Sequence, residues 1–246
     1  MSRCALALLL LTLPLQAVAA PQKPLVAEPT PQALSPFDDV RRSAERQVKV
    51  WQKRAAKLEV AWRADMPGPA LLTDLGERLD PARFQDQGLA WAQHNAGLWG
   101  LQSADWSVLH VQKGKLRTTL RLSQTALVSG IRVPVLQRGM ALTIDAQGQM
   151  VSVTSEAVPL GKLTLERIAK ADAQKTALKA VLGLREDRNL PLDRVHRCEL
   201  AVLAGPTEAR LVWAVDIVVQ AATDRRAVLI DAETGVLLSQ RSAVHH

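Results

Sequence analysis

The five histidines are the first residues to consider for chemistry, because a zinc peptidase helix carries two histidines four residues apart with a glutamate between them. No pair in this chain has that spacing; the histidines are His94, His110, His196, His245 and His246. His245 and His246 could still bind a metal in a partner's site, since neutral imidazole is a good zinc ligand. A pair at a chain end is more often part of a frayed tail. The sequence therefore predicts no metal site and no cofactor within the chain itself.

Cys198 is the second candidate, as a nucleophile, and it would need a base beside it. His196 lies two residues earlier, in a segment with a strand pattern. Residues two apart in a strand share a face, so the imidazole and the thiol could meet. The alternative is a buried thiol without reactivity, which is the commoner role of such a cysteine.

Asp145 and Asp231 are the carboxylates that could be mistaken for catalytic groups. They begin the segments Asp-Ala-Gln-Gly and Asp-Ala-Glu-Thr-Gly. An aspartate followed closely by glycine normally accepts hydrogen bonds from the backbone of its own turn. The 13 glycines of the chain lie at turns and predicted helix ends, and none belongs to a loop that would cradle a phosphate. We therefore predict that the chain is not an enzyme.

Residues 1–20 have the pattern of a secretory signal peptide. Arg3 precedes an apolar run that Pro14 interrupts, and residues 17–20 are suited to cleavage. The run is shorter than the roughly 20 residues that a spanning helix needs, and no later segment is long and apolar enough. We expect an exported protein, extracellular or periplasmic, with no transmembrane segment in its mature form.

The composition fits a packed globular protein. Hydrophobic residues make up 48% of the chain, and Cys198 is the only cysteine after the signal peptide, so no intramolecular disulfide can form. The mature length of about 225 residues suits one large domain or two small ones. The net charge of +7 is spread along the chain with few aromatic residues among the cations, so we predict no nucleic-acid binding. An acidic protein partner and an anionic envelope surface both stay open.

A linker and a basic helix are expected before the main fold. Residues 21–36 contain five prolines and predict an extended, semi-rigid linker. Residues 37–58 place apolar side chains every three or four positions, with arginines and lysines on the other faces, as an amphipathic helix does. One interpretation is a helix that binds a membrane surface or a partner. The other is a helix packed on the core with a solvated basic face.

The rest of the chain predicts two α+β units in tandem, each an antiparallel sheet packed with a helix. The turns at Asp145 and Asp231 echo each other after similar helix-and-sheet segments, so we assign the units to 59–160 and 161–240, with a tail at 241–246. The expected helices cover Pro81 to about Trp99 and Thr164 to Leu182. The expected strands are 58–62, 70–75, an antiparallel meander within 106–158, 197–203, 210–219, 227–230 and 236–239.

Several of these segments together resemble a known family. Within 116–136, Arg121 and Gln124 precede Gly130 and Val133-Pro134-Val135; residues 145–153, 164–182, 211–215 and 230–237 follow in order. This set resembles the propeptide region of thermolysin-like and fungalysin-like metallopeptidases, a unit called FTP followed by a PepSY-like unit. The resemblance covers most of residues 59–240 and implies a cystatin-like fold for the first unit and a PepSY-like fold for the second.

The resemblance implies a function, because such propeptides act as folding chaperones and as inhibitors of their own peptidase. This chain stops at His246, where a peptidase domain would begin, so we expect a propeptide-like protein that binds a secreted thermolysin-like or fungalysin-like metallopeptidase in trans. The candidate contacts are Arg121, Gln124, His245 and His246, together with the exposed sheet and the segment after Leu237. Thr125 and Arg138-Gly139-Met140 depart from the family pattern. The alternatives are a non-catalytic envelope adaptor that uses the 37–58 helix, and the leading fragment of a longer protease precursor.

Overall fold

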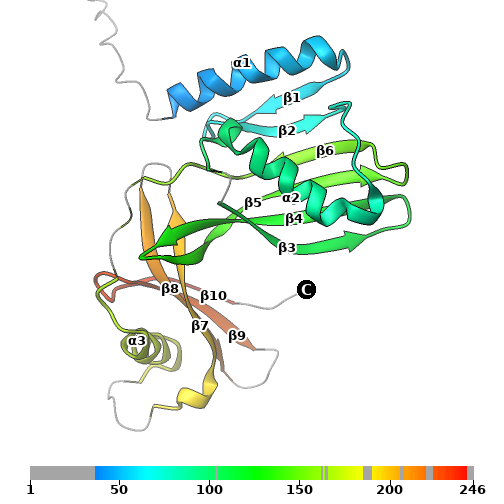
Figure 1. Ribbon diagram of the computed structural model, residues 1–246. Helices are drawn as coiled ribbons and strands as arrows, with labels where there is room; N and C mark the ends of the chain where they lie inside the picture. Colours follow the sequence, from blue (N-terminus) through cyan, green and yellow to red (C-terminus); the bar gives the residue numbers. More distant parts are fainter. Residues whose placement is uncertain are drawn as a thin grey trace, which may run out of the picture. The chain divides into compact units, whose positions relative to one another are not determined.

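The computed structural model describes residues 37–102, 105–161, 163, 166–184, 190–205, 208–219 and 224–242. The predicted signal peptide, the linker at 21–36 and the pair His245 and His246 lie outside the described residues. The fold is α+β, as predicted from the sequence, and it combines long antiparallel strands with a few helices (Figure 1). Among the described residues, no helix combines the length and the apolar character that crossing a membrane requires.

Helix α1 runs from Asp38 to Arg54, four residues short of the predicted end at residue 58. It ends because Ala55 leaves the helical region, with φ −118° and ψ 87°, and its carbonyl accepts the amide of Leu58 in a turn. Ala44 and Val48 are buried in the core, whereas the lysines and arginines of the helix lie mostly on its exposed side. In this structure α1 is thus packed on the core with a solvated basic face.

In the described part of the chain, the first sheet has six strands in the spatial order β1-β2-β6-β5-β4-β3, and all neighbours are antiparallel. The meander expected within 106–158 is β3 to β6. The strand bounds are β1 Glu59–Trp62, β2 Pro69–Thr73, β3 Trp106–Lys113, β4 Arg117–Val128, β5 Ile131–Asp145 and β6 Met150–Ser155.

The first hydrophobic core lies between this sheet and its helices. The short 3-10 helix η1 (Pro81–Arg83), helix α2 (Phe84–His94) and the 3-10 helix η2 (Ala96–Trp99) replace the single helix predicted there. Phe84 and Trp99 pack with Leu120, Leu122 and Leu142, which are the inward residues of β4 and β5. The strand period in the sequence therefore selects which side chains face the helices and which face away.

The second sheet has the order β7-β8-β9-β10 and packs against helix α3. Its elements are α3 (Lys170–Leu182), the 3-10 helix η4 (Leu192–Arg194), β7 (Val195–Ala204), β8 (Ala209–Val218), β9 (Arg225–Asp231) and β10 (Leu237–Ser242). Strand β10 runs two residues into the predicted tail at 241–246.

The predicted start of α3 at Thr164 is wrong for the described residues, because 166–169 are not helical. The amides of Arg167 and Ile168 both donate to the carbonyl of Ala232 at 2.9 Å. The Ile168 carbonyl accepts the indole N–H of Trp213 at 2.9 Å. These long-range bonds hold the segment as a loop, and the helix begins only at Lys170.

A wide bulge in β5 connects the two sheets. Between the pairs Ser123–Gly139 and Thr125–Pro134, β5 places residues 135–138 opposite Gln124 alone. Gln137 has a φ of 57° there, and the diverted strand pairs in parallel with β7 at Val135 and Val202. Val133 and Val135 consequently belong to the second core, which therefore draws residues from both sides of residue 160.

Candidate functional site

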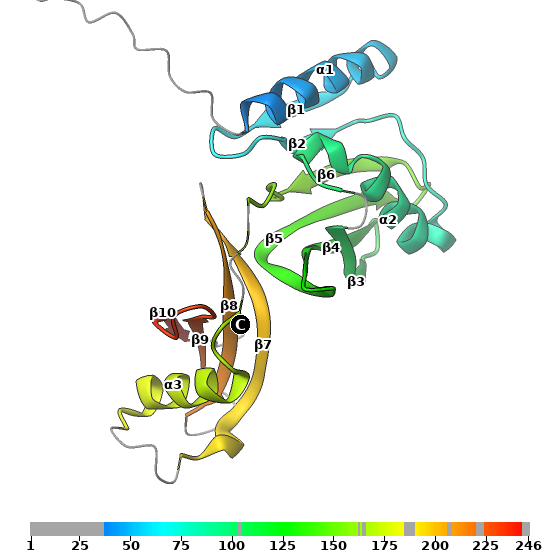
Figure 2. The ribbon, with the colours of Figure 1, turned by 60° about the vertical axis from the view of Figure 1, so that its left-hand side comes forward.

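In both sheets the described helices cover only one face. Helices α1 and α2 contribute to the core on one side of the first sheet, and α3 packs on one side of the second (Figures 1 and 2). The opposite face of the first sheet presents Thr119, Arg121 and Ser123 of β4, beside Gly139 and Ala141 of β5. These two uncovered faces, which meet at the β5 bulge, are the candidate functional surface.

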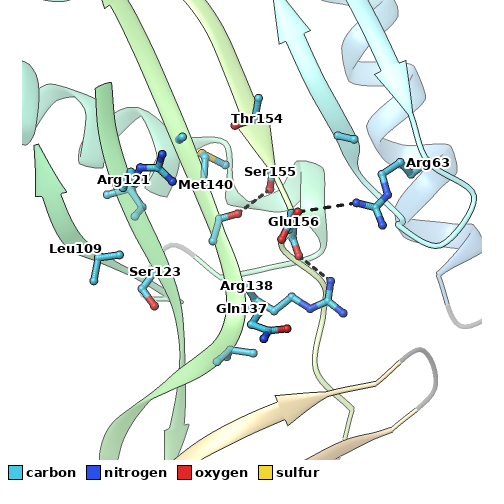
Figure 3. Close-up of a pocket in the computed structure, with 15 residues that line it drawn as sticks. Arg63, Leu109, Arg121, Ser123, Gln137, Arg138, Met140, Thr154, Ser155 and Glu156 are labelled. Carbon is cyan, nitrogen blue, oxygen red and sulfur yellow. Dashed lines mark hydrogen bonds and ion pairs between the residues drawn. The ribbon is translucent and has the colours of Figure 1, made fainter. Parts of the chain in front are cut away.

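A groove of about 500 Å³ lies on the uncovered face of the first sheet, and we call it the Arg121 groove (Figure 3). Strands β4, β5 and β6 form its floor, and it is bordered by Arg63, by Ala70 of β2 and by Leu109 of β3. Its lining combines three arginines and a glutamate with small, hydroxyl-bearing and apolar residues: Arg63, Ala70, Leu109, Arg121, Leu122, Ser123, Val135, Gln137, Arg138, Gly139, Met140, Ala141, Thr154, Ser155 and Glu156.

Two of the three arginines already have partners. Arg63 donates two hydrogen bonds to the carboxylate of Asp65, at 3.0 and 2.7 Å, and lies 4.0 Å from Glu156. The hydrogen bond from Arg63 holds the pKa of Asp65 below its usual value. Arg138 donates to the carbonyls of Glu156 and Ala204, both at 3.3 Å, and so ties the end of β6 to the end of β7.

Arg121 differs from these two arginines. It lies on the β4 side of the groove, whereas Arg63 and Arg138 flank Glu156 on the other side (Figure 3). Within the part of the chain that the structure describes, its guanidinium makes no hydrogen bond and no ion pair. Arg121 is exposed, and its alternation with the inward Leu120 and Leu122 keeps it on the uncovered face.

Gln124, the other strand residue predicted as a partner contact, has a structural role. Its side chain is fully buried. Its amide nitrogen donates to the Val158 carbonyl at 2.6 Å, and its amide oxygen accepts the Val158 amide at 3.1 Å. Val158 follows β6, and the Gln124 side chain makes with its backbone the two hydrogen bonds that a neighbouring strand would otherwise make. A direct contact of Gln124 with a partner stays a prediction that this burial does not favour.

A second depression, of about 410 Å³, lies on the uncovered face of the second sheet, and we call it the β7–β10 face. Its floor is apolar and its edges carry charges, and one wall is the β5 bulge. Ser123, Val135 and Gln137 line both this face and the Arg121 groove. The full lining is Ser123, Pro134, Val135, Leu136, Gln137, Arg197, Glu199, Ala201, Leu203, Ala214, Asp216, Ala227, Leu229, Ser239 and Arg241.

Cys198 and His196 do not form a catalytic pair in this structure. A register irregularity between Val195 and Arg197 breaks the simple alternation of β7. As a result His196 is exposed while Cys198 faces the second core. Burial raises the pKa of the Cys198 thiol, which favours the unreactive protonated form.

The two turn aspartates behave as the sequence predicts. Asp145 Oδ1 accepts the amides of Gln147 and Gln149, both at 2.9 Å. Asp231 Oδ1 accepts the amides of Glu233 and Thr234 at 2.9 and 2.8 Å. Among the described residues, no group of three histidines, cysteines or carboxylates is placed to hold a metal ion.

The β5 bulge, the role of Arg138 and the position of Leu109 in the groove are not predicted from the sequence. Leu109 is the extra residue of a bulge in β3, between the pairs that Val108 and His110 make. One local feature does coincide with the end of the β5 bulge, namely the departure of Arg138-Gly139-Met140 from the pattern of the resembling family. A Cβ on Gly139 would collide with the carbonyl oxygen of Leu122.

Comparison with known proteins leaves the chain without an assigned family. No protein-family model and no curated protein matches the sequence. Among solved structures, the C-terminal domain of YpeB from Bacillus megaterium aligns with 10% identity and a TM-score of 0.38, over 85% of this chain and 98% of that domain. A lipoprotein described as putative from Clostridium difficile aligns with 10% identity and a TM-score of 0.22, over 64% and 91% of the two chains. YpmB from Bacillus subtilis aligns with 14% identity and a TM-score of 0.21, over 56% and 88%. These values are too low to carry a fold or an activity over to this chain.

Proposed function

We propose that this chain is an exported, non-catalytic protein that binds a secreted thermolysin-like or fungalysin-like metallopeptidase in trans, as an inhibitor, a folding chaperone or both. In this proposal 59–160 is the FTP-like unit and 161–240 is the PepSY-like unit. The observation that carries it is the pair of uncovered sheet faces that meet at the β5 bulge. Both faces are hollowed, and they share Val135 and Gln137 in their linings.

The geometry of the faces supports binding to a protein rather than to a small molecule. Pockets for small ligands are usually deep and enclosed by apolar walls, whereas these depressions are open and spread over strands of both sheets. The strands are held in ladders before any partner arrives, so docking would cost little conformational entropy.

Strand β10 offers a further mode of contact. It pairs with β9 alone in the described structure, which makes it an edge strand, and residues 240–242 are exposed. An edge strand can add a strand from a partner through main-chain hydrogen bonds. This is the segment after Leu237 that the sequence singles out.

The test is a titration of a purified thermolysin-like peptidase, co-exported by the same organism, with this chain in excess. We expect slower peptide hydrolysis, a higher refolding yield of the denatured peptidase, or both. Ala214→Arg, which places a long cation on the floor of the β7–β10 face, should weaken the effect about tenfold or more. Val50→Arg, on the exposed side of α1, is the matched control and should leave it unchanged. An unchanged peptidase rate together with an unchanged refolding yield would reject the proposal.

The basic face of α1 supports a second candidate, an adaptor that attaches to anionic envelope material. Arg42, Arg46, Lys49 and Lys53 are exposed. Deleting the helix would be a poor test, because Ala44 and Val48 belong to the core. The sharper variant changes these four cations to glutamine. Salt-sensitive binding to anionic envelope material that this variant loses would favour the adaptor.

A further inference from the structure

The Arg121 groove is positively charged after its internal pairs are counted. Its charged lining residues are Arg63, Arg121, Arg138 and Glu156. Glu156 lies beside Arg63, and Arg63 is also held by Asp65. Arg138 donates to two backbone carbonyls, and Asp65 is close enough to interact with its charge. Three arginines thus face two carboxylates, Glu156 and Asp65, which leaves one positive charge. Among the described residues Arg121 is the arginine of the groove without a carboxylate partner, so its guanidinium keeps its charge and its hydrogen-bond donors.

The surroundings of Arg121 set the shape of what could bind there. Leu109 borders the groove and has 65% of its surface exposed, because the β3 bulge re-aims its side chain. Gly139 and Ala141 of β5 lie on the other side of β4. Because neither carries a large side chain, the surface of the sheet is recessed there. An extended chain can therefore lie across the strands with one residue against Leu109 and a neighbouring residue at Arg121.

We propose that the Arg121 groove binds an extended acidic segment of a partner protein, with one aspartate or glutamate carboxylate paired to Arg121 and an adjacent apolar side chain packed on Leu109. This inference rests on the proposed function, because it names the chemistry of the segment through which the partner docks. The planar guanidinium can bind a carboxylate through two parallel hydrogen bonds, which gives direction as well as charge attraction.

A protein segment fits the groove better than a nucleic acid does. Single-stranded nucleic acids are held by aromatic side chains that stack on the bases, and none of the described residues that line the groove is aromatic. The groove offers instead apolar surface for a side chain at Leu109, and hydroxyls at Ser123 and Thr154.

The test uses a fluorescent, end-blocked peptide, Gly-Thr-Val-Asp-Val-Thr-Gly, and the same peptide with asparagine in place of aspartate. Binding is followed by fluorescence anisotropy up to about 1 mM protein, the weak end of specific affinity. We expect the aspartate peptide to bind at least about tenfold more tightly than the asparagine peptide, since the loss of one good charge-assisted pair costs about that factor. The Arg121→Gln variant should abolish this difference.

Arg117→Gln is the matched control. Arg117 lies four residues before Arg121 on the same strand and outside the groove lining, so its variant loses the same charge and should keep the preference for aspartate. Thermal melting of both variants checks that they fold. Equal binding of the two peptides, no binding of either, or equal losses in the two variants would overturn the inference. So would Arg121-dependent binding of inorganic phosphate or of a DNA oligonucleotide without binding of the peptide.

The peptidase titration separates this inference from the function on which it rests. If the aspartate peptide binds through Arg121 but the peptidase keeps its rate and its refolding yield, the groove assignment stands and the peptidase as partner is rejected. If the peptidase is inhibited equally by the wild-type chain and by Arg121→Gln, the partner stands and the acidic contact is rejected.

Discussion

The Arg121 groove and the β7–β10 face are both uncovered sheet surfaces, but they differ in whether their arginines are paired with carboxylates. On the β7–β10 face Arg197 pairs with Glu199, and the hydrogen bond from Arg197 holds the pKa of Glu199 below its usual value. The floor between them is apolar, with Ala214 and Leu229. In the groove, Arg121 has no such partner among the described residues. The β7–β10 face thus combines a paired arginine with apolar surface, whereas the groove holds an arginine that has no carboxylate partner among the described residues.

The largest expected effect comes from removing the Gln124 side chain, whose two hydrogen bonds hold the backbone of Val158. Gln124→Ala should lower the free energy of unfolding by about 2–4 kcal/mol, because it creates a cavity and leaves the Val158 amide and carbonyl buried without partners. Urea unfolding measures the change. Ser123→Ala, at the neighbouring half-buried position, should cost less than about 1 kcal/mol. A cost for Gln124→Ala as small as that of Ser123→Ala would contradict a structural role.

The β5 bulge should be the next most sensitive feature. Gly139→Ala places a methyl group against the Leu122 carbonyl, and relief of this overlap requires a backbone shift that costs about 1–3 kcal/mol. Gly97→Ala is the control, because a Cβ at Gly97 meets no atom within 4 Å. Denaturant melts of the two variants give the comparison. Equal stability of the two would show that β4 and β5 are packed less closely than described.

The Asp231 turn should make the second sheet sensitive to acid. Burial alone would raise the pKa of Asp231. The amides of Thr234 and Glu233, the Thr234 hydroxyl and the charge of Arg210 lower it and together outweigh burial, so the pKa lies below its usual value. A carboxyl group with a lowered folded-state pKa stabilises the fold above the unfolded value of about 3.9, and this stabilisation is lost as pH falls through the folded-state pKa.

Asp231→Asn should therefore cost about 1 kcal/mol at pH 7 and should reduce the loss of stability between about pH 5 and pH 2. Thermal melts across that range measure both quantities. If the melting temperature fell as steeply toward acid pH in the variant as in the wild-type chain, Asp231 would not contribute to the acid sensitivity.

The smallest effect is expected for the ion pair on the β7–β10 face. Arg197 and Glu199 are largely exposed, with side-chain exposures of 60% and 48%, and exposed pairs contribute at most about 1 kcal/mol. Arg197→Gln should thus barely change the melting temperature. Its effect should appear in specificity, because the released Glu199 carboxylate would then repel acidic peptides from this face. A large loss of stability would mean that the pair is a structural element.

The local features of this fold can be predicted from the sequence. Apolar alternation in β4 correctly separates Leu120 and Leu122 from Arg121, and the turns at Asp145 and Asp231 follow from one aspartate and one glycine each. Those features depend on residues a few positions apart. The start of α3 could not be read in the same way, because the amides of Arg167 and Ile168 are bound by Ala232, more than sixty residues away in the chain.

The candidate site was predictable only in part, for the same physical reason. The family resemblance predicts partner contacts at both Arg121 and Gln124, yet the fold exposes the first and buries the second. The strand alternation already separates them, because Gln124 shares the face of Leu120 and Leu122 whereas Arg121 lies on the other face. What the alternation does not show is the β5 bulge opposite Gln124. A bulge of four residues against one depends on pairing with β7 as well as on β4, and no local pattern encodes it.

The central claim, that the two uncovered faces together form the docking surface for a secreted metallopeptidase, is tested most directly by calorimetric affinities for one co-exported thermolysin-like enzyme. The chains to compare are wild type, Ala141→Arg in the first face, Ala214→Arg in the second face and Val50→Arg on α1. We predict that both alanine variants bind at least about tenfold more weakly, a loss of about 1.4 kcal/mol, and that Val50→Arg binds as the wild type does. No binding by the wild-type chain, or the same affinity for all four chains, would contradict the claim.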